Sequence, residues 1–272
     1  MVERQRYGAL AFAVRADIQV PFDEVSPPQA ELQLTPEGGY QSTRVGQYSF
    51  RELVSFSSAS TVVAGSRSGR DETYDLLATT TIEDFNVLGV VTADKIVARM
   101  AAYYSLEGGP LSILPLGSHF ENLRIAGYRV EVDLATDTFS RLATAERVRE
   151  AYRENDEGFR DEFDALTLRG QGDGILARLQ RYFPWAGLQP GDEIPEREGL
   201  IHCGLVREIS GLGSEIGCHG HTIYVRGFGA IRLAELRLTD AFRRLSMVEI
   251  DLGSTPQGHV SGGGVGAPGS GW

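Results

Sequence analysis

Residues 76–104, LLATTTIEDFNVLGVVTADKIVARMAAYY, decide the fold class of this chain. The stretch contains a β-branched run at residues 79–82 and an aliphatic run at residues 87–91. β-Branched side chains favour extended backbone, because their χ1 angles are restricted in helices and they pack well on a pleated surface. We therefore predict that this stretch forms strands of a sheet.

Within it, residues 94–104 are compatible with two conformations. Ile96, Ala98 and Met100 alternate along the chain, as in a strand with one buried face. Alanine and lysine would also permit a helix. Because the alternation is the stronger indication, we expect a strand here as well.

Similar patterns extend over most of the chain. Apolar alternation or β-branched runs predict strands at residues 7–20, 47–64, 120–134, 200–209, 222–225, 230–238 and 245–252. Residues 22–40 hold paired prolines and paired glycines, so we expect a loop-rich connection there.

Residues 140–199 differ from the rest and predict a short helical insertion. Thr144 is placed to cap a helix, since its hydroxyl oxygen can accept from the first free backbone N–H groups. The apolar stripe of that helix would be Val148, Ala151 and Tyr152. A second helix is expected over residues 173–183, because Pro184 cannot continue it.

The predicted fold is mainly β. Residues 1–252 should form a single antiparallel β-sandwich-like domain that carries the helical insertion. Residues 253–272 follow as a glycine-rich C-terminal tail, which has too few apolar side chains for a core of its own. Such a tail could dock onto a neighbouring subunit with Trp272 as an aromatic anchor, or fold back on its own chain.

Charge and hydropathy exclude several classes of partner. The net charge is −11 and the pI is about 5.0, whereas nucleic-acid binding and anionic membrane surfaces need a basic footprint. No apolar run approaches the roughly 20 residues of a membrane span. The short apolar run at residues 8–14 is expected to be a first strand rather than a signal peptide.

A weak internal repeat links two of the predicted strand regions. IEDFNVLG at residues 82–89 aligns with FENLRIAG at residues 120–127. Each unit ends in glycine, which in a strand context marks a bulge or a tight bend. The repeat predicts two equivalent strand–turn–strand units in one sheet, and chance similarity between two β segments is the alternative.

Three segments resemble the bacterial choice-of-anchor surface proteins. They are IEDFNVLGVVTAD (residues 82–94), GSHFENLRIAG (residues 117–127) and TIYVRGFGAIRLAE (residues 222–235), and they follow in the order found in that family. The resemblance covers about half of the chain, and its motifs are β-structural. It implies an extracellular or cell-surface β-rich module and brings no catalytic residues with it.

The chain departs from that family in three ways. Arg226 stands where the family usually has proline. The helical insertion and the lack of a visible signal peptide are also unusual for it. If no signal peptide exists, a cytoplasmic protein is expected instead of a surface protein.

The densest group of reactive side chains lies in two short segments. His202 and Cys203 form one of them, and Cys218, His219 and His221 form the other. If the expected strands at residues 201–209 and 222–225 are neighbours, both groups lie near the same end of a sheet. Three outcomes stay open: a Cys203–Cys218 disulfide, two free structural thiols, or a zinc site, for which thiolate and imidazole are suitable ligands.

The acidic segments match no metal-binding or catalytic pattern well, and the common catalytic motifs are missing from the sequence, so a non-enzymatic protein is expected. Residues 154–164 are rich in carboxylates, but they lack the alternating spacing of a calcium loop. Glu249 and Asp251 share one strand face, as a glycosidase pair would, although we expect an exposed strand face there. The sequence contains no nucleophile elbow, phosphate-binding loop or convincing dinucleotide fingerprint.

These observations lead to three functional hypotheses. The first is a non-enzymatic structural protein that assembles into homo-oligomers through its sheets and its tail, with no cofactor. The second is a small-molecule or carbohydrate-binding module, or a hydrolase, in which aromatic side chains such as Tyr103 stack on sugars. The third is a zinc protein that uses the Cys/His group.

Overall fold

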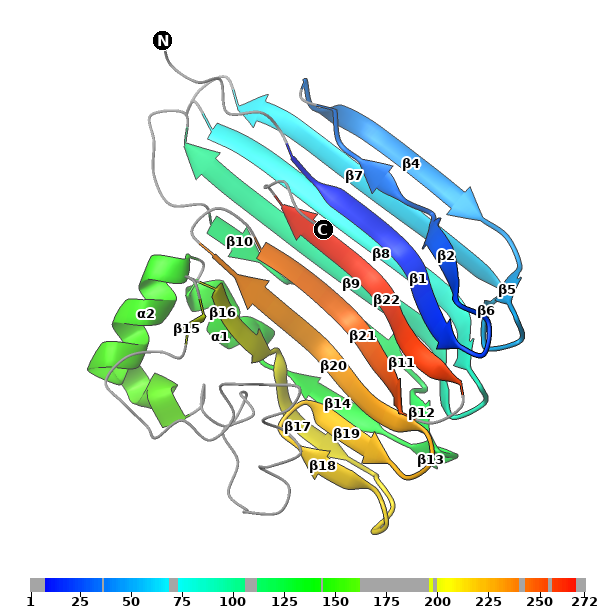
Figure 1. The fold of residues 1–272 in the computed structure, drawn as a ribbon. Helices are drawn as coiled ribbons and strands as arrows, with labels where there is room; N and C mark the ends of the chain where they lie inside the picture. Colours follow the sequence, from blue (N-terminus) through cyan, green and yellow to red (C-terminus); the bar gives the residue numbers. More distant parts are fainter. Residues whose placement is uncertain are drawn as a thin grey trace.

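Two antiparallel sheets dominate the computed structural model (Figure 1). It describes residues 8–35, 37–68, 73–105, 112–142, 144–161, 196–197, 200–239, 243–253 and 256–267. The sheets pack face to face, with a helical segment beside them. The mainly β, sandwich-like fold predicted from the sequence is confirmed.

The first sheet, sheet A, has the strand order β15-β16-β20-β21-β22-β1-β2. Its strands are β1 (Leu10–Val20), β2 (Glu24–Gln29), β3 (Leu32–Gln33), β15 (Glu196–Arg197), β16 (Leu200–Gly204), β18 (Gly217–His219), β19 (Thr222–Val225), β20 (Gly229–Leu238), β21 (Arg243–Gly253) and β22 (Gln257–Ala267). β3 pairs with β1, and the β18–β19 hairpin pairs with β20 through β19. Strands from the two ends of the chain, β1 and β22, are thus neighbours in this sheet.

The second sheet, sheet B, has the strand order β13-β12-β9-β8-β6-β5, with β10 and β11 on β9 and a β4–β7 pair on β8. Its strands are β4 (Gly39–Val45), β5 (Tyr48–Phe50), β6 (Val54–Phe56), β7 (Ser58–Ser68), β8 (Thr73–Val87), β9 (Val91–Ser105), β10 (Ser112–Leu114), β11 (His119–Glu121), β12 (Arg124–Ile125) and β13 (Tyr128–Arg129). β8 and β9 come from the stretch that decided the fold class. The ambiguous segment at residues 94–104 lies within β9 and is a strand, as expected.

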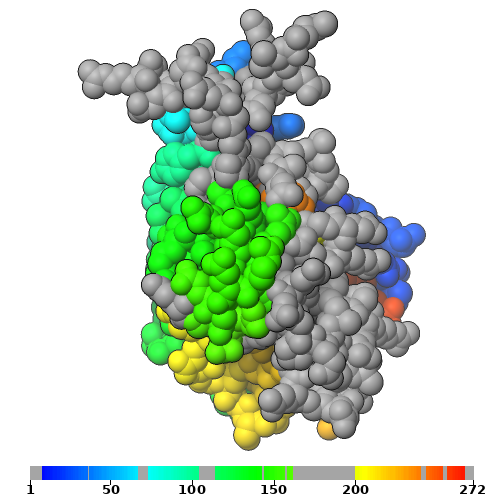
Figure 2. All heavy atoms as spheres, turned by 90° about the vertical axis from the view of Figure 1, so that its left-hand side faces the viewer, coloured from blue at the N-terminus to red at the C-terminus, as the bar shows by residue number. Residues whose placement is uncertain are grey.

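The helical insertion lies beside β16 and forms one side of the molecule (Figures 1 and 2). It holds α1 (Thr136–Arg141), α2 (Ala145–Glu154) and the 3₁₀ helix η1 (Asp156–Gly158), and a small sheet pairs β14 (Glu131–Leu134) with β17 (Val206–Ser210). The predicted cap is confirmed, because the backbone N–H of Arg147 donates to Thr144 Oγ1 at 3.1 Å. The expected helix at residues 173–183 lies outside the described residues. No helix in the described ranges is long and apolar enough to cross a membrane.

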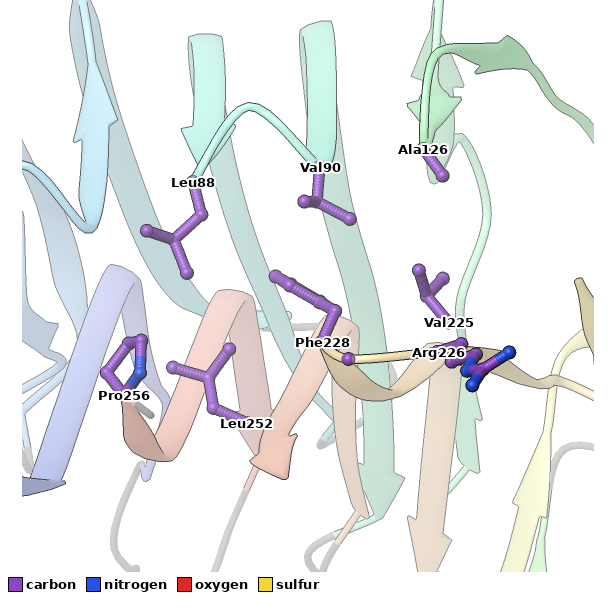
Figure 3. Close-up of a pocket in the computed structure, with 9 residues that line it drawn as sticks. Leu88, Val90, Ala126, Val225, Arg226, Phe228, Leu252 and Pro256 are labelled. Carbon is purple, nitrogen blue, oxygen red and sulfur yellow. The ribbon is translucent and has the colours of Figure 1, made fainter. Parts of the chain in front are cut away.

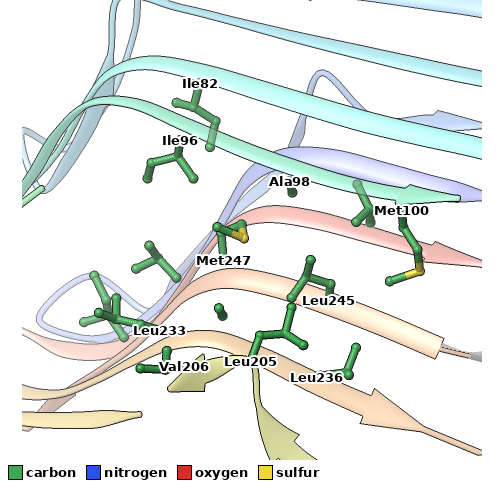
Figure 4. Packing of buried hydrophobic residues seen from close by; sticks show 14 of the residues in the cluster. Ile82, Ile96, Ala98, Met100, Leu205, Val206, Leu233, Leu236, Leu245 and Met247 are labelled. Carbon is green, nitrogen blue, oxygen red and sulfur yellow. The ribbon is translucent and has the colours of Figure 1, made fainter. Parts of the chain in front are cut away.

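The hydrophobic core fills the space between the two sheets (Figure 4). From sheet B, Ile82, Ile96 and Met100 point into it, and from sheet A, Leu233 and Leu245 do so. All five side chains are fully or almost fully buried. Burial of each contributes about 1.5–3 kcal/mol relative to an exposed position, so these side chains stabilise the contact between the two sheets.

The connection at residues 22–40 contains more regular structure than predicted. β2, β3 and the start of β4 lie in it. β2 tolerates Pro27 and Pro28 because it is an edge strand, where a missing backbone N–H need not break a ladder.

The prediction that residues 253–272 form a separate glycine-rich tail is wrong for the part that the structure describes. Residues 257–267 form β22, which pairs with β21 on one side and with β1 on the other. The domain boundary at residue 252 therefore cuts through sheet A. Trp272 lies outside the described residues, so its docking role stays a prediction.

The internal repeat is confirmed as two equivalent units on either side of β9. Glu83 and Glu121 both lie opposite Lys95, and Val87 and Ile125 both lie opposite Val91. The backbone repeats as well: the third, seventh and eighth residues of each unit have positive φ angles, at Asp84, Leu88 and Gly89 and at Asn122, Ala126 and Gly127. The second unit continues sheet B across β9 with the same local geometry as the first.

Candidate functional site

The predicted Cys/His group is only partly brought together. β16 and β19 pair with the same edge of β20, which places the imidazole of His221 directly over Gly204. The thiols, however, are separated: Cys203 faces the core and is fully buried, whereas Cys218 is exposed on β18. Both are free, which matches the free-thiol outcome among the three left open by the sequence and contradicts a Cys203–Cys218 disulfide.

The zinc alternative receives no support from this geometry. Within the part of the chain that the structure describes, no three His, Cys, Asp or Glu side chains gather closely enough to hold a metal ion. Burial raises the pKa of the Cys203 thiol, which keeps it in the protonated form that binds metals poorly. His202 instead contacts a carboxylate, with Nε2 at 2.9 Å from Glu235 Oε1.

Glu235 belongs to a dense group of charged side chains among the residues that the structure describes. In β20, Ile231 and Leu233 face the core, so Arg232 between them faces away from sheet B. We name the side chains gathered on this outer face of sheet A the charge cluster. Its members are His202, Arg232, Glu235, Arg237, Arg244, Glu249, Asp251 and His259.

Arg232 is the centre of the charge cluster, and each of its guanidinium nitrogens faces a different carboxylate. Nε lies 3.0 Å from Glu235 Oε2, Nη1 donates to Asp251 Oδ2 at 2.6 Å, and Nη2 donates to Glu249 Oε2 at 3.4 Å. Arg232, Glu235 and Glu249 are only 6%, 1% and 2% exposed. A rigid, planar guanidinium suits such a site, because it presents its donors in a fixed fork.

The remaining members complete the pairing. Arg237 Nε donates to Glu235 Oε1 at 2.9 Å, and Arg244 Nη2 donates to Glu249 Oε1 at 3.4 Å. His259 Nδ1 lies 2.8 Å from Asp251 Oδ1. Three arginines thus face three carboxylates, which is the balance that buried charges require.

At Glu235, Asp251 and Arg232, ion pairing shifts the pKa in the expected direction, whereas burial lowers the pKa of Arg244. Burial acts to raise the pKa of Glu235, but the His202 contact and the charges of Arg237 and Arg232 outweigh it and hold that pKa well below its usual range. Burial also opposes the shift at Asp251, where hydrogen bonds from His259 and Arg232 lower the pKa to about 2. For Arg232, the attraction of the carboxylates exceeds the effect of burial and raises the pKa.

The ion pairs argue against acid–base chemistry by the Glu249 and Asp251 pair. A glycosidase needs a protonated carboxyl group as its general acid, whereas arginines contact both of these carboxylates, Arg244 at Glu249 and Arg232 at Asp251. The expectation of an exposed strand face is also wrong, since Glu249 is buried. The charge cluster connects β16, β20, β21 and β22 by ion pairs, which form only in the observed register of sheet A.

The outer face of sheet B carries a shallow hollow of about 680 Å³. Tyr40 on β4 and Tyr103 on β9 stand on either side of it and are 69% and 43% exposed. Asp75 and Arg99 add polar groups to its lining. The hollow is where the predicted stacking of sugars on Tyr103 would take place.

The edge of sheet B beside this hollow is the strand β4. Among the described strands, β4 pairs only with β7, and its register runs without a break from Gly39–Gly65 to Val45–Ala59. Its other edge is the end of the sheet (Figure 1). Tyr40, Ser42 and Arg44 are exposed on the same face of β4. The strand therefore presents a straight row of backbone groups and an exposed aromatic side chain.

Comparison with known proteins identifies a family but no activity. Neither the curated proteins nor the solved structures contain a match to this chain. The family model of a domain of unknown function, DUF8256, matches residues 6–239. The matched region ends just after β20, so β21 and β22 lie beyond it. Because the match spans most of the chain, the protein belongs to the DUF8256 family.

Proposed function

We propose that this protein is a non-enzymatic structural protein that self-associates by pairing β4 of one copy with β4 of another. The observation that carries the proposal is the unprotected edge of sheet B at β4. Pairing there would satisfy backbone groups that otherwise face solvent, and it would extend sheet B across two copies.

The edge strands β2 of sheet A and β4 of sheet B differ in the features that prevent pairing with another chain. At the edge of sheet A, β2 carries Pro27 and Pro28, and its register with β1 shifts between Val14 and Ala16. Prolines and bulges are devices by which proteins prevent edge-to-edge association. β4 has no proline, lysine or bulge over its seven residues. The contrast favours β4 as an edge that is meant to pair.

The sequence of β4, GYQSTRV, is complementary to itself in one antiparallel register. With Ser42 on the two-fold axis, Tyr40 of each copy lies opposite Arg44 of the other, and Gln41 lies opposite Thr43. A guanidinium over a tyrosine ring is worth about 0.5–1 kcal/mol at an exposed site, and each dimer would form two such pairs. In the single chain, Arg44 makes a 3.4 Å contact to Ser58 on the exposed surface, which a partner can replace.

A charge swap tests this register. We expect the wild-type protein to form dimers in sedimentation velocity runs and Tyr40→Lys to be monomeric at the same concentration. The lysine would face Arg44 of the other copy, and two like-charge pairs should weaken the dimer by about tenfold or more. The double variant Tyr40→Lys/Arg44→Glu restores opposite charges and should restore the dimer.

Because Tyr40 is mostly exposed, neither variant should change the fold, and circular dichroism serves as the control. A wild-type protein that stays monomeric at every accessible concentration would exclude the proposal. So would a Tyr40→Lys variant that dimerises as well as the wild type.

The carbohydrate-binding alternative stays a prediction. Its favourable feature is the hollow between Tyr40 and Tyr103, which presents two exposed rings on a flat sheet. Tyr40 belongs to both hypotheses, whereas Tyr103 lies on β9, away from the β4 edge. A substitution at Tyr103 therefore leaves the proposed dimer intact.

A further inference from the structure

A pocket at one open end of the sandwich is built from turns of both sheets (Figure 3). Its volume is about 320 Å³, at the lower end of the range for small-molecule sites. Leu88 and Val90 point toward Phe228 and Leu252 across it. Leu88 and Val90 come from the β8–β9 turn of sheet B, and Phe228 and Leu252 come from sheet A.

The two units of the internal repeat meet at this pocket. Leu88 of the first unit and Ala126 of the second are equivalent positions, and both line it. The turns are joined directly, since the backbone N–H of Ala126 donates to the carbonyl of Val90 at 2.8 Å. The duplication therefore supplies two copies of one turn to the rim of one cavity.

The backbone at these two positions is strained in the same way. Leu88 has φ +54° and Ala126 has φ +51°, a left-handed conformation in which glycine, asparagine or aspartate would sit with less strain. Residues kept in such a conformation are enriched at ligand-binding and active sites. At both turns the side chain in question is an apolar group that lines the pocket.

Arg226 is the one charged side chain among the described residues that line the pocket. It lies at the end of the lining near Ala126, and the other described lining residues are apolar or glycine (Figure 3). Arg226 is exposed, and within the described residues no ion pair or hydrogen bond of its side chain is found. A cation at the mouth of an apolar cavity fits a ligand that has an apolar chain and one anionic end.

We propose that this pocket binds a short-chain amphipathic carboxylate, with the chain between Leu88 and Phe228 and the carboxylate on Arg226. The site is independent of β4, because it lies at the end of the sandwich and not at the edge of sheet B. The proposed site thus differs from the charge cluster, where arginines and carboxylates pair with one another.

Isothermal titration calorimetry on the full chain tests the site with three probes. Octanoate should bind saturably, 1-octanol should bind about tenfold more weakly because it lacks the charge, and acetate should not bind because it lacks the chain. Arg226→Gln should weaken octanoate by about tenfold and leave octanol unchanged. Arg226 is exposed, so this variant should fold normally.

Leu88→Gly separates a binding role from a structural one. Glycine relieves the left-handed backbone strain at this turn, which offsets part of the cost of removing a side chain that packs against the core. The variant should therefore stay folded, and a cooperative thermal unfolding transition checks this. It should nevertheless weaken octanoate and octanol by a similar factor, because the wall of the pocket is lost. Glu52→Gly is the matched control, because Glu52 also has a left-handed backbone, with φ +58°, but lies in the exposed β5–β6 turn and does not line the pocket, so binding should stay at the wild-type level.

Two results would overturn the proposal. One is the absence of saturable octanoate binding. The other is octanoate binding that neither Arg226→Gln nor Leu88→Gly changes, because the ligand would then be bound elsewhere.

Discussion

A chain that ends at Leu252 should fail to fold. β22 pairs with β21 along nearly its whole length and with β1 along its other edge, so its loss would leave a gap in the middle of sheet A. The open edges and the uncovered core residues cannot be compensated locally. We expect the truncated chain to lack near-ultraviolet circular dichroism and a cooperative unfolding transition. A truncated protein that unfolds cooperatively would show that residues 257–267 are dispensable.

Alanine substitutions at two glycines of β22 test how closely this strand packs against the core. A Cβ added at Gly264 would overlap the ring of Phe12, which is only 3% exposed and packed in place. A Cβ added at Gly262 would meet Phe85 at 3.4 Å, an ordinary contact. Gly264→Ala should therefore lower the free energy of unfolding by about 1–3 kcal/mol, and Gly262→Ala should change it much less.

Replacement of Arg232 by methionine should cost about 3–5 kcal/mol of unfolding free energy. Removing one partner of a buried ion pair leaves uncompensated charge behind, and here three carboxylates lose their common partner. Urea denaturation of the wild type and the variant measures the difference. Arg147→Met is the matched control, because Arg147 pairs with Glu150 on the exposed surface of α2 and such pairs contribute about 0–1 kcal/mol. Equal effects of the two variants would contradict a structural role for the charge cluster.

The acid dependence of stability gives a second readout of the charge cluster. The pKa of Asp251 is lowered from its ordinary 3.8 to about 2 in the folded protein. A lowered pKa stabilises the fold above pH 3.8, and this contribution is lost as the pH falls toward 2. Without Arg232, only His259 would lower the pKa of Asp251, so that pKa should rise toward 3.8. Between pH 3.8 and pH 2, the unfolding free energy of Arg232→Met should therefore fall less than that of the wild type. Urea denaturation at a series of pH values measures both.

Local patterns in the sequence predict the parts of the fold that depend on nearby residues. The alternation in residues 94–104 gives β9, Thr144 gives the start of α2, and the eight-residue repeat gives two equivalent turns. In each case the cause lies within a few residues of the effect. A β-branched run or a capping hydroxyl acts on its own backbone.

The errors concern residues whose role is set by distant partners. Gly262 and Gly264 have no side chains in β22 where the rings of Phe85 and Phe12, from β8 and β1, occupy the adjacent space. Composition alone cannot distinguish such a strand from a mobile tail. Glu249 is buried because β21 and β20 pair in the register that sets it beside Arg232, and that register is not visible in either strand by itself.

One indication of the charge cluster was nevertheless present in the sequence. The segments IRLAELRL and MVEIDL place charged residues between apolar ones, with two arginines and one glutamate in the first segment and two acids in the second. Complementary charges on two predicted strands favour pairing between them. The degree of burial could not have been predicted, because it depends on the rest of the fold.

Cysteine cross-linking measures the β4–β4 pairing directly. In a Cys218→Ser background, which removes the exposed native thiol, Ser42→Cys places one thiol opposite its own copy on the two-fold axis. Directly opposed residues of antiparallel strands have Cα atoms about 4.5–5.5 Å apart, within reach of a disulfide. Thr43→Cys is the control, because Thr43 faces Gln41 of the other copy and not itself. We predict a disulfide-linked dimer from Ser42→Cys under mild oxidation and little from Thr43→Cys; equal cross-linking by both, or by neither, would contradict assembly through this edge.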